Sequence, residues 1–242
     1  MPLEVSSFGA PMVLRFVTAA LKFVAFVAYL AGLPLLMLWL SGNWHWIQGW
    51  IFGSWFFVLF GICLFWMYFK DPALLDERLR VPGTGGESRF DLVILTAVKV
   101  GFIGWFFLPS LDVRYGWTSR QPMWGEMLGG IALLSGSFFL FRSITDNTFL
   151  SQVVRIQTDR GHRVVDTGVY GFVRHPMYLG VCLILVGGPL LLGSATGLIP
   201  GVAVILLLIL RIMGEEKLLI HDLLGYQAYR QKVRYRLVPH VW

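Results

Sequence analysis

Arg174-His175-Pro176, followed by Tyr178, forms a polar cluster at the start of an apolar segment. Proline suits the first helical position because its missing N–H would have no partner there. We therefore expect a helix to begin at Pro176, with His175 at or near the N-cap and Tyr178 on the same side of the helix mouth. Free N–H groups and the positive dipole end favour an anionic ligand there. The alternative is an ordinary interfacial turn, in which the arginine binds lipid phosphate and the histidine caps the helix.

Arg211 and the adjacent carboxylates Glu215 and Glu216 form a second polar cluster, at the end of the next apolar segment. Two carboxylates beside a membrane interface are costly unless they are paired or bind something. The arginine could orient an acidic ligand through two parallel hydrogen bonds, and a histidine or glutamate could take a proton from an amine. The alternative is a helix pair between Arg211 and Glu215, worth roughly a few tenths of a kcal/mol, with Glu216 solvated.

Two short apolar segments, Tyr178–Leu192 and Thr196–Met213, must position these clusters. The glycines and proline near residues 187–189 and 193 predict a tight helical hairpin between them. Because the hairpin is tight, its two polar ends must lie near each other. We therefore expect His175, Tyr178, Arg211, Glu215 and Glu216 to be neighbours. Whether the two segments fully span a membrane stays open.

The composition indicates a membrane protein. The 242 residues are 56% hydrophobic and only 14% charged, against about 25% charged in an average soluble domain. A transmembrane helix needs roughly 20 mostly apolar residues. We predict an all-α integral membrane protein with about six transmembrane helices, the last two forming the hairpin. The other predicted spans are Met12–Leu40, Trp46–Phe69, Leu92–Leu111 and Trp124–Phe141.

The placement of lysine and arginine predicts the orientation. With six spans, nearly all of these residues fall on one side, and only Arg114 and Arg120 fall on the other. Both termini should then face the cytoplasm, and we expect the first apolar segment to remain as an anchor. Residues 1–144 would form a transmembrane scaffold of about four spans, and residues 145–242 the catalytic region.

Other features of the chain narrow the function. Cys63 and Cys182 lie in apolar runs and form neither a disulfide framework nor a metal site. The loop Lys70–Phe90 contains a short amphipathic helix, ALLDERLR, and a flexible GTGGES stretch that is no dinucleotide fingerprint. Lys22 and Lys99 fall within predicted spans, and Lys99 either lines an internal cavity or snorkels or pairs internally. We expect no nucleic-acid partner and no obligate protein partner.

The C-terminal motifs resemble the isoprenylcysteine carboxyl methyltransferase family, which is related to phospholipid and thiol methyltransferases. The matching motifs are H-x-x-V-x-x-G-x-Y (His162–Tyr170), R-H-P-x-Y-x-G (Arg174–Gly180), E-E (Glu215-Glu216), G-Y-x-x-Y (Gly225–Tyr229) and V-x-x-R-L-V-P (Val233–Pro239). The resemblance covers roughly the last 90 residues. The stretch DPALLDERLR is more loosely similar to bacterial members, and we expect a bacterial inner (cytoplasmic) membrane with the active site facing the cytoplasm.

The resemblance implies that S-adenosylmethionine is bound by the loop before the hairpin and by both hairpin ends. The implied cofactor-binding residues are His162, Val164, Val165, Tyr170, His175, Pro176, Met177, Tyr178 and Glu215. Arg211 matches the position that engages the substrate near its reacting carboxylate, and is the implied catalytic and substrate-binding residue. Arg155 stands where eukaryotic members carry glutamine, so that contact is not transferred.

The resemblance leaves the methyl acceptor open. It implies a lipophilic acceptor, first of all the carboxylate of a prenylcysteine, which reaches the site from the bilayer among the membrane lipids. A phospholipid amine and a small thiol are alternatives in the same class. Sterol reductases, which use NADPH, share an R-H-P-x-Y-type motif, but they are usually longer. A non-enzymatic membrane scaffold would leave the polar clusters unexplained.

Overall fold

The computed structural model describes residues 10–83, 88–118 and 121–242, with side chains from residue 26 onward. Within these ranges the secondary structure is helical and contains no strand. The α-helices are α1 (Ala10–Ser41), α2 (Ile47–Lys70), α3 (Pro72–Leu79), α4 (Arg89–Tyr115), α5 (Met123–Asp146), α6 (Pro176–Leu191), α7 (Leu198–Asp222) and α8 (Tyr226–Lys232), with short 3₁₀ turns η1 (Thr158–Arg160) and η2 (Gly168–Gly171).

Each predicted span coincides with a helix. In the described part of the chain α2, α4, α5 and α7 are long and apolar enough to cross a membrane, whereas α6 has only 16 residues. At 1.5 Å per residue α6 is about 24 Å long, less than a hydrocarbon core of about 30 Å. Six crossings and cytoplasmic termini therefore remain predictions. The all-helical membrane fold is confirmed.

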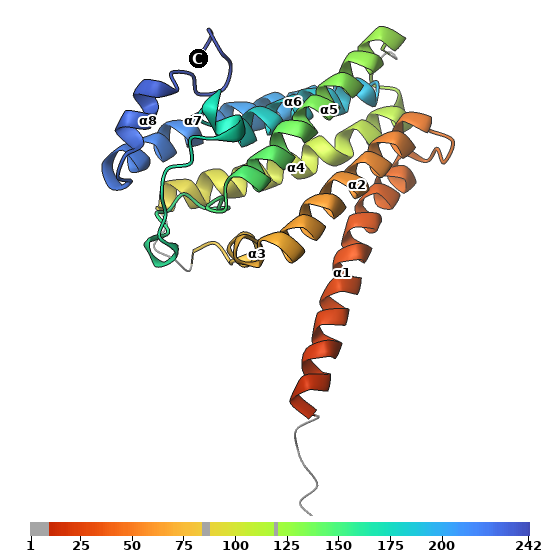
Figure 1. The fold of residues 1–242 in the computed structure, drawn as a ribbon. Helices are drawn as coiled ribbons and strands as arrows, with labels where there is room; N and C mark the ends of the chain where they lie inside the picture. The colour runs from red at the N-terminus through yellow and green to blue at the C-terminus, as the bar shows by residue number, and fades with distance from the viewer. Residues whose placement is uncertain (1–9, 84–87, 119–120) are drawn as a thin grey trace, which may run out of the picture.

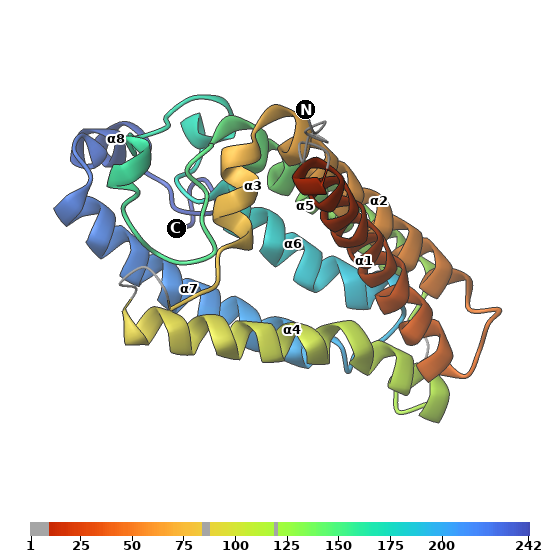
Figure 2. The same cartoon turned by 90° about the horizontal axis from the view of Figure 1, so that it is seen from below.

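The long helices α2, α4, α5, α6 and α7 form a bundle, and α1 diverges from it towards the N-terminus (Figure 1). The helices α3 and α8 lie at one end of the bundle, together with the connection between α5 and α6 (Figures 1 and 2). The amphipathic helix predicted in the loop after the second span is confirmed as α3. Residues 84–87, most of the predicted flexible stretch, lie outside the described residues.

Glycines bring α5 and α6 into backbone contact. A Cβ on Gly136 would lie 2.7 Å from the carbonyl oxygen of Gly180, and a Cβ on Gly129 would lie 2.3 Å from the backbone nitrogen of Leu191. This is the close packing of small residues expected between membrane helices. It fixes α5, and the loop that leaves it, against the first arm of the hairpin.

A buried carboxylate ties down the hairpin turn at the far end of the bundle. Asp112 accepts hydrogen bonds from Ser194 Oγ at 2.5 Å and from Thr196 Oγ1 at 3.0 Å, both in the turn between α6 and α7. Near the middle of the hairpin, Trp105 Nε1 donates to the carbonyl oxygen of Leu185 at 2.8 Å. The helix α4 therefore holds the hairpin along its length.

Two further predictions concern single lysines. Lys99 is exposed on the outside of α4 and lies apart from the residues that line the cavity described below. The idea that Lys99 lines an internal cavity is therefore wrong, and an outward-facing side chain that snorkels fits its position. The side chain of Lys22 lies outside the described residues.

Candidate active site

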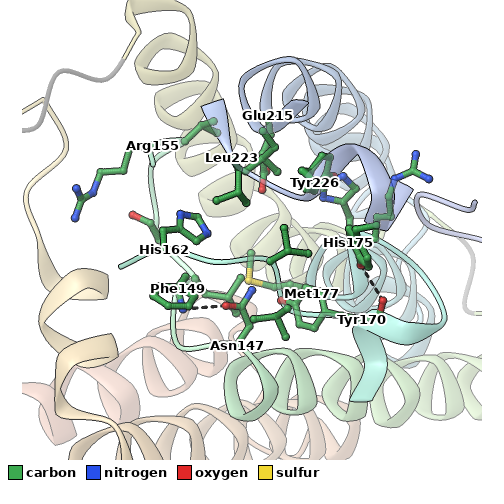
Figure 3. A pocket seen from close by; sticks show the side chains of 18 of the residues that line it. Asn147, Phe149, Arg155, His162, Tyr170, His175, Met177, Glu215, Leu223 and Tyr226 are labelled. Carbon is green, nitrogen blue, oxygen red and sulfur yellow. Dashed lines mark hydrogen bonds between the residues drawn. The ribbon is translucent and has the colours of Figure 1, made fainter. Parts of the chain in front are cut away.

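A cavity opens at the end of the bundle that carries α3 and α8. Its walls come from the α5–α6 connection, the start of α6, the last turns of α7, and α8 (Figure 3). The space that water-sized molecules can occupy in the cavity is about 90 Å³, and about 820 Å³ is free of protein atoms when the open solvent at its mouth is counted. Apolar side chains such as Val153, Leu219 and Leu223 share the lining with polar groups. Apolar walls with a few convergent polar groups are typical of small-molecule sites.

Nearly all the site residues inferred from the sequence line this cavity. They are His162, Val164, Val165, Tyr170, His175, Met177, Tyr178, Arg211 and Glu215. The exception is Pro176, which is buried at the first position of α6, with His175 at the N-cap as predicted. The His175 side chain makes no capping hydrogen bond, so it does not act as the helix cap of the alternative interpretation.

A hydrogen bond between Tyr178 and Glu215 joins the two arms of the hairpin at the cavity wall. Tyr178 Oη donates to Glu215 Oε2 at 2.7 Å. Tyr178 is buried and Glu215 is partly exposed towards the cavity. The bond holds one carboxylate oxygen of Glu215. The other oxygen has no hydrogen-bond partner among the described residues and is available to a ligand.

The neighbouring Glu216 is a structural carboxylate. It accepts from Arg174 Nε at 2.6 Å and from Arg236 Nε at 2.7 Å, and His175 Nε2 lies 3.4 Å from Oε1. Only 3% of Glu216 is exposed, so the suggestion that it is solvated is wrong. Arg174 also donates to the carbonyl oxygen of Val233, and this network fastens the C-terminal tail over the start of α6.

Arg211 pairs with α4 instead of with its own helix. Its Nε donates to Asp91 Oδ1 at 2.8 Å, and its Nη2 donates to Asp91 Oδ2 at 3.4 Å and to the carbonyl oxygen of Gln152. Asp91 Oδ2 also accepts from the backbone N–H of Val154 at 2.9 Å. The Arg211–Glu215 helix pair considered from the sequence is therefore wrong, because a carboxylate 120 positions away in sequence takes the guanidinium.

His162 lies on the loop wall of the cavity. Its ring stacks on Phe149 with centroids 4.8 Å apart, and its Nδ1 accepts from the backbone N–H of Gln157 at 3.3 Å. Burial lowers the pKa of His162 below its ordinary value of 6.5. The ring is therefore neutral near pH 7, and with Nδ1 as an acceptor its proton lies on Nε2.

Tyr170 is held by a tightly packed turn, η2. The backbone N–H of Val169 donates to Asp146 Oδ2 at 3.0 Å, and Tyr229 Oη donates to the carbonyl oxygen of Tyr170 at 2.8 Å. Gly168 has a φ of +59°, and a Cβ there would lie 1.9 Å from Asp146 Oδ2. Only glycine fits both restrictions, which explains the glycine in the motif that precedes Tyr170.

Two buried phenols offer unused hydrogen-bonding groups. Tyr170 Oη and Tyr226 Oη have no hydrogen-bond partner within the described residues, and both side chains line the cavity. Buried polar atoms are normally paired, so these two oxygens favour a polar ligand in the cavity. Motif comparison pointed to Tyr170. The roles of Asp91, Asp146, Phe149 and Tyr226 were missed, because each depends on a contact between distant segments.

No metal site accompanies the cavity in the described ranges. No group of three or more histidine, cysteine, aspartate or glutamate side chains is arranged there to hold a metal ion. The chemistry of the cavity must therefore be judged from its carboxylates, phenols, imidazoles and guanidinium groups.

These features define a helical membrane protein with a small-molecule cavity at one end of its bundle. Residues 132–221, which include α6 and most of α5 and α7, match the model of the isoprenylcysteine carboxyl methyltransferase (ICMT) family. The predicted resemblance to this family is confirmed over the region that builds most of the cavity.

The known proteins that are similar to this chain include a curated relative and a solved structure. Lamin-B receptor from Drosophila melanogaster is 27% identical over 154 residues, which cover 56% of this chain but only 20% of that protein. A solved structure of the eukaryotic intramembrane Ras methyltransferase ICMT covers 98% of this chain and 88% of its own, with 18% identity and a TM-score of 0.56. At this identity the second comparison shows a shared fold.

Proposed function

We propose that this protein is an integral-membrane, S-adenosylmethionine-dependent methyltransferase that acts on a lipophilic acceptor. The preferred acceptor is the carboxylate of a prenylcysteine-like molecule, and the site faces the cytoplasm of a bacterial inner membrane. The observation that carries the proposal is the cavity that gathers nine of the inferred site residues from three separate segments. The family match covers the same region of the chain.

The residues present fit this cofactor. S-adenosylmethionine supplies an electrophilic methyl group on a positively charged sulfur. Glu215, held by Tyr178, would supply negative charge to that cation, and the faces of aromatic rings in the cavity would attract its positive charge. Tyr170 Oη and Tyr226 Oη offer hydrogen bonds to polar atoms of the cofactor. His162 adds a neutral donor on the loop wall.

Methyl transfer needs alignment more than acid–base chemistry. A carboxylate or thiolate acceptor requires no base, so the chain must hold the donor and acceptor in line and exclude water, which supplies most of the effect. The apolar lining from Val153, Leu219 and Leu223 suits that role. An amine acceptor would have to lose a proton, for which Glu215 is placed on the cavity wall.

A transfer assay with labelled methyl groups tests the proposal. Purified protein in liposomes would be given labelled S-adenosylmethionine with a prenylcysteine, phosphatidylethanolamine or a small thiol, side by side. We expect label in the prenylcysteine methyl ester. Label in the lipid or the thiol would change the acceptor but keep the class, and binding of NADPH without S-adenosylmethionine binding would favour a reductase instead. Binding of neither cofactor would overturn the proposal and favour a scaffold.

A further inference from the structure

Helix α3 is docked against the loop that walls the cavity. Glu77 Oε2 accepts from Arg155 Nη2 at 2.7 Å, and Glu77 Oε1 accepts from Ser151 Oγ at 2.7 Å. Hydrogen bonding to Arg155 lowers the pKa of Glu77, so this contact is ionic near pH 7. The Gln152 side chain also donates to the carbonyl oxygen of Arg78. The backbone at Arg78, the next residue, is therefore held in position against the loop.

Arg78 lies beside the cavity, in contact with a residue of its wall, and carries a positive charge without a matching negative one. Its Nη2 contacts Met177 Sδ at 3.1 Å, and Met177 lines the cavity at the start of α6. A thioether sulfur is a weak acceptor, whereas a guanidinium has five N–H donors. Among residues 10–83, 88–118 and 121–242, no carboxylate forms an ion pair with Arg78. Burial lowers the pKa of Arg78, yet arginine stays charged in proteins.

Arg78 lies within electrostatic range of residues that line the cavity. They include the cavity-lining residues Tyr170 and Tyr178 and, as a like charge, Arg211. Two guanidinium groups therefore act on this part of the cavity. Arg211 already has Asp91 and the Gln152 carbonyl as partners. Within the described part of the chain, the side chain of Arg78 has the Met177 thioether alone. A partly buried cation of this kind is costly unless a ligand completes it.

We propose that Arg78 binds the acidic group of the methyl acceptor and thereby sets the preference of the site for an anionic acceptor. The inference rests on the proposed methyltransferase function and names the residue that selects its substrate. It assigns Arg211, by contrast, to the Asp91 pair that holds α4, α7 and the loop together. A guanidinium recognises a carboxylate through two parallel, charge-assisted hydrogen bonds. An ester or an amide of the same acceptor carries no negative charge and cannot form this pair.

Binding of an acid and its ester tests this without turnover. We would measure by calorimetry, in detergent, the affinity of an N-acetyl prenylcysteine and of its methyl ester for wild type and for Arg78→Met. Methionine keeps most of the length of arginine and removes the charge, so folding should survive. We expect wild type to prefer the acid by about tenfold or more, and Arg78→Met to lose that preference while its ester affinity stays within about threefold. Arg78→Lys should restore part of the preference.

Two controls make the result decisive. Arg230→Met removes an exposed arginine from α8 and should leave the acid preference unchanged. S-adenosylmethionine affinity should stay within about threefold in Arg78→Met. An acid preference that persists in Arg78→Met would overturn the inference. A selective loss of S-adenosylmethionine binding in this variant would also overturn it, because it would assign Arg78 to the carboxylate of the cofactor. Because acid binding is measured without turnover, absence of methyl transfer in wild type would count against the proposed function alone.

Discussion

The hydrogen bond from Tyr178 Oη to Glu215 Oε2, 2.7 Å long, joins residues 37 positions apart in the chain. Tyr178 lies in the first turn of α6 and Glu215 lies near the end of α7. The hairpin brings these two ends together, and the bond joins them at the cavity wall. The same arrangement aims Glu215 at the cavity, while Glu216, one residue later, pairs with Arg174 before α6 and with Arg236 of the tail.

Loss of the Glu215 carboxylate should weaken binding of S-adenosylmethionine. We expect Glu215→Ala to reduce the affinity by about a hundredfold or more, because the carboxylate that would face the cation is removed. We expect Tyr178→Phe to reduce the affinity by about tenfold, because the carboxylate remains but is no longer held by the phenol. Calorimetry with purified protein measures both. Asp222→Ala, which removes an exposed carboxylate from the end of the same helix, is the control. Wild-type affinity in Glu215→Ala would disprove the cofactor role.

Loss of the Glu216 carboxylate should destabilise the fold. Glu216→Ala would leave Arg174, whose side chain is 4% exposed, as an unpaired buried charge. Breaking such a pair costs about 3–5 kcal/mol. We expect a large fall in the thermal unfolding midpoint in detergent. The double variant Glu216→Ala with Arg174→Met should recover part of the loss, and equal midpoints for wild type and the single variant would contradict the structural role.

A methyl group at Gly136 should separate α5 from α6. In Gly136→Ala the new Cβ would meet the Gly180 carbonyl oxygen at 2.7 Å and the Ile184 nitrogen at 3.1 Å. Backbone atoms cannot yield as a side chain can, so we expect a destabilisation of about 1–3 kcal/mol. Gly130→Ala is a matched control on the same helix, because its nearest neighbour is Leu191 Cδ1 at 3.9 Å. Thermal unfolding should show a lower midpoint only for Gly136→Ala.

Stability should depend on the protonation of His162. Burial lowers the folded-state pKa of His162 below 6.5, so the unfolded chain binds its proton more readily. The stabilisation linked to neutral His162 is therefore fully present above pH 6.5 and is lost as the pH falls through the lowered pKa. We expect wild type to lose more thermal stability between about pH 7.5 and about pH 5.5 than His162→Phe, which keeps an aromatic ring against Phe149. Equal losses would argue against a buried neutral imidazole.

The sequence by itself determined the helical membrane class and nine of the residues that line the cavity. Apolar runs of about 20 residues leave few folds other than helices, because the backbone must satisfy its own hydrogen bonds in lipid. The turn glycines and the proline of the R-H-P motif are local signals, and they place the hairpin and its N-cap correctly. That is why His175, Tyr178 and Glu215 could be predicted as neighbours before the structure was known.

Only the tertiary structure decided which charges pair. Periodicity on one helix suggested Arg211 with Glu215, but Arg211 binds Asp91 on α4. Glu216 pairs with Arg174 before α6 and with Arg236 in the tail, and Arg78 reaches Met177 from a separate surface helix. Such pairings depend on how whole helices pack. A partner four residues along the same helix competes with every charged group that folding brings closer. The local sequence does not specify which distant residues become neighbours in the folded protein.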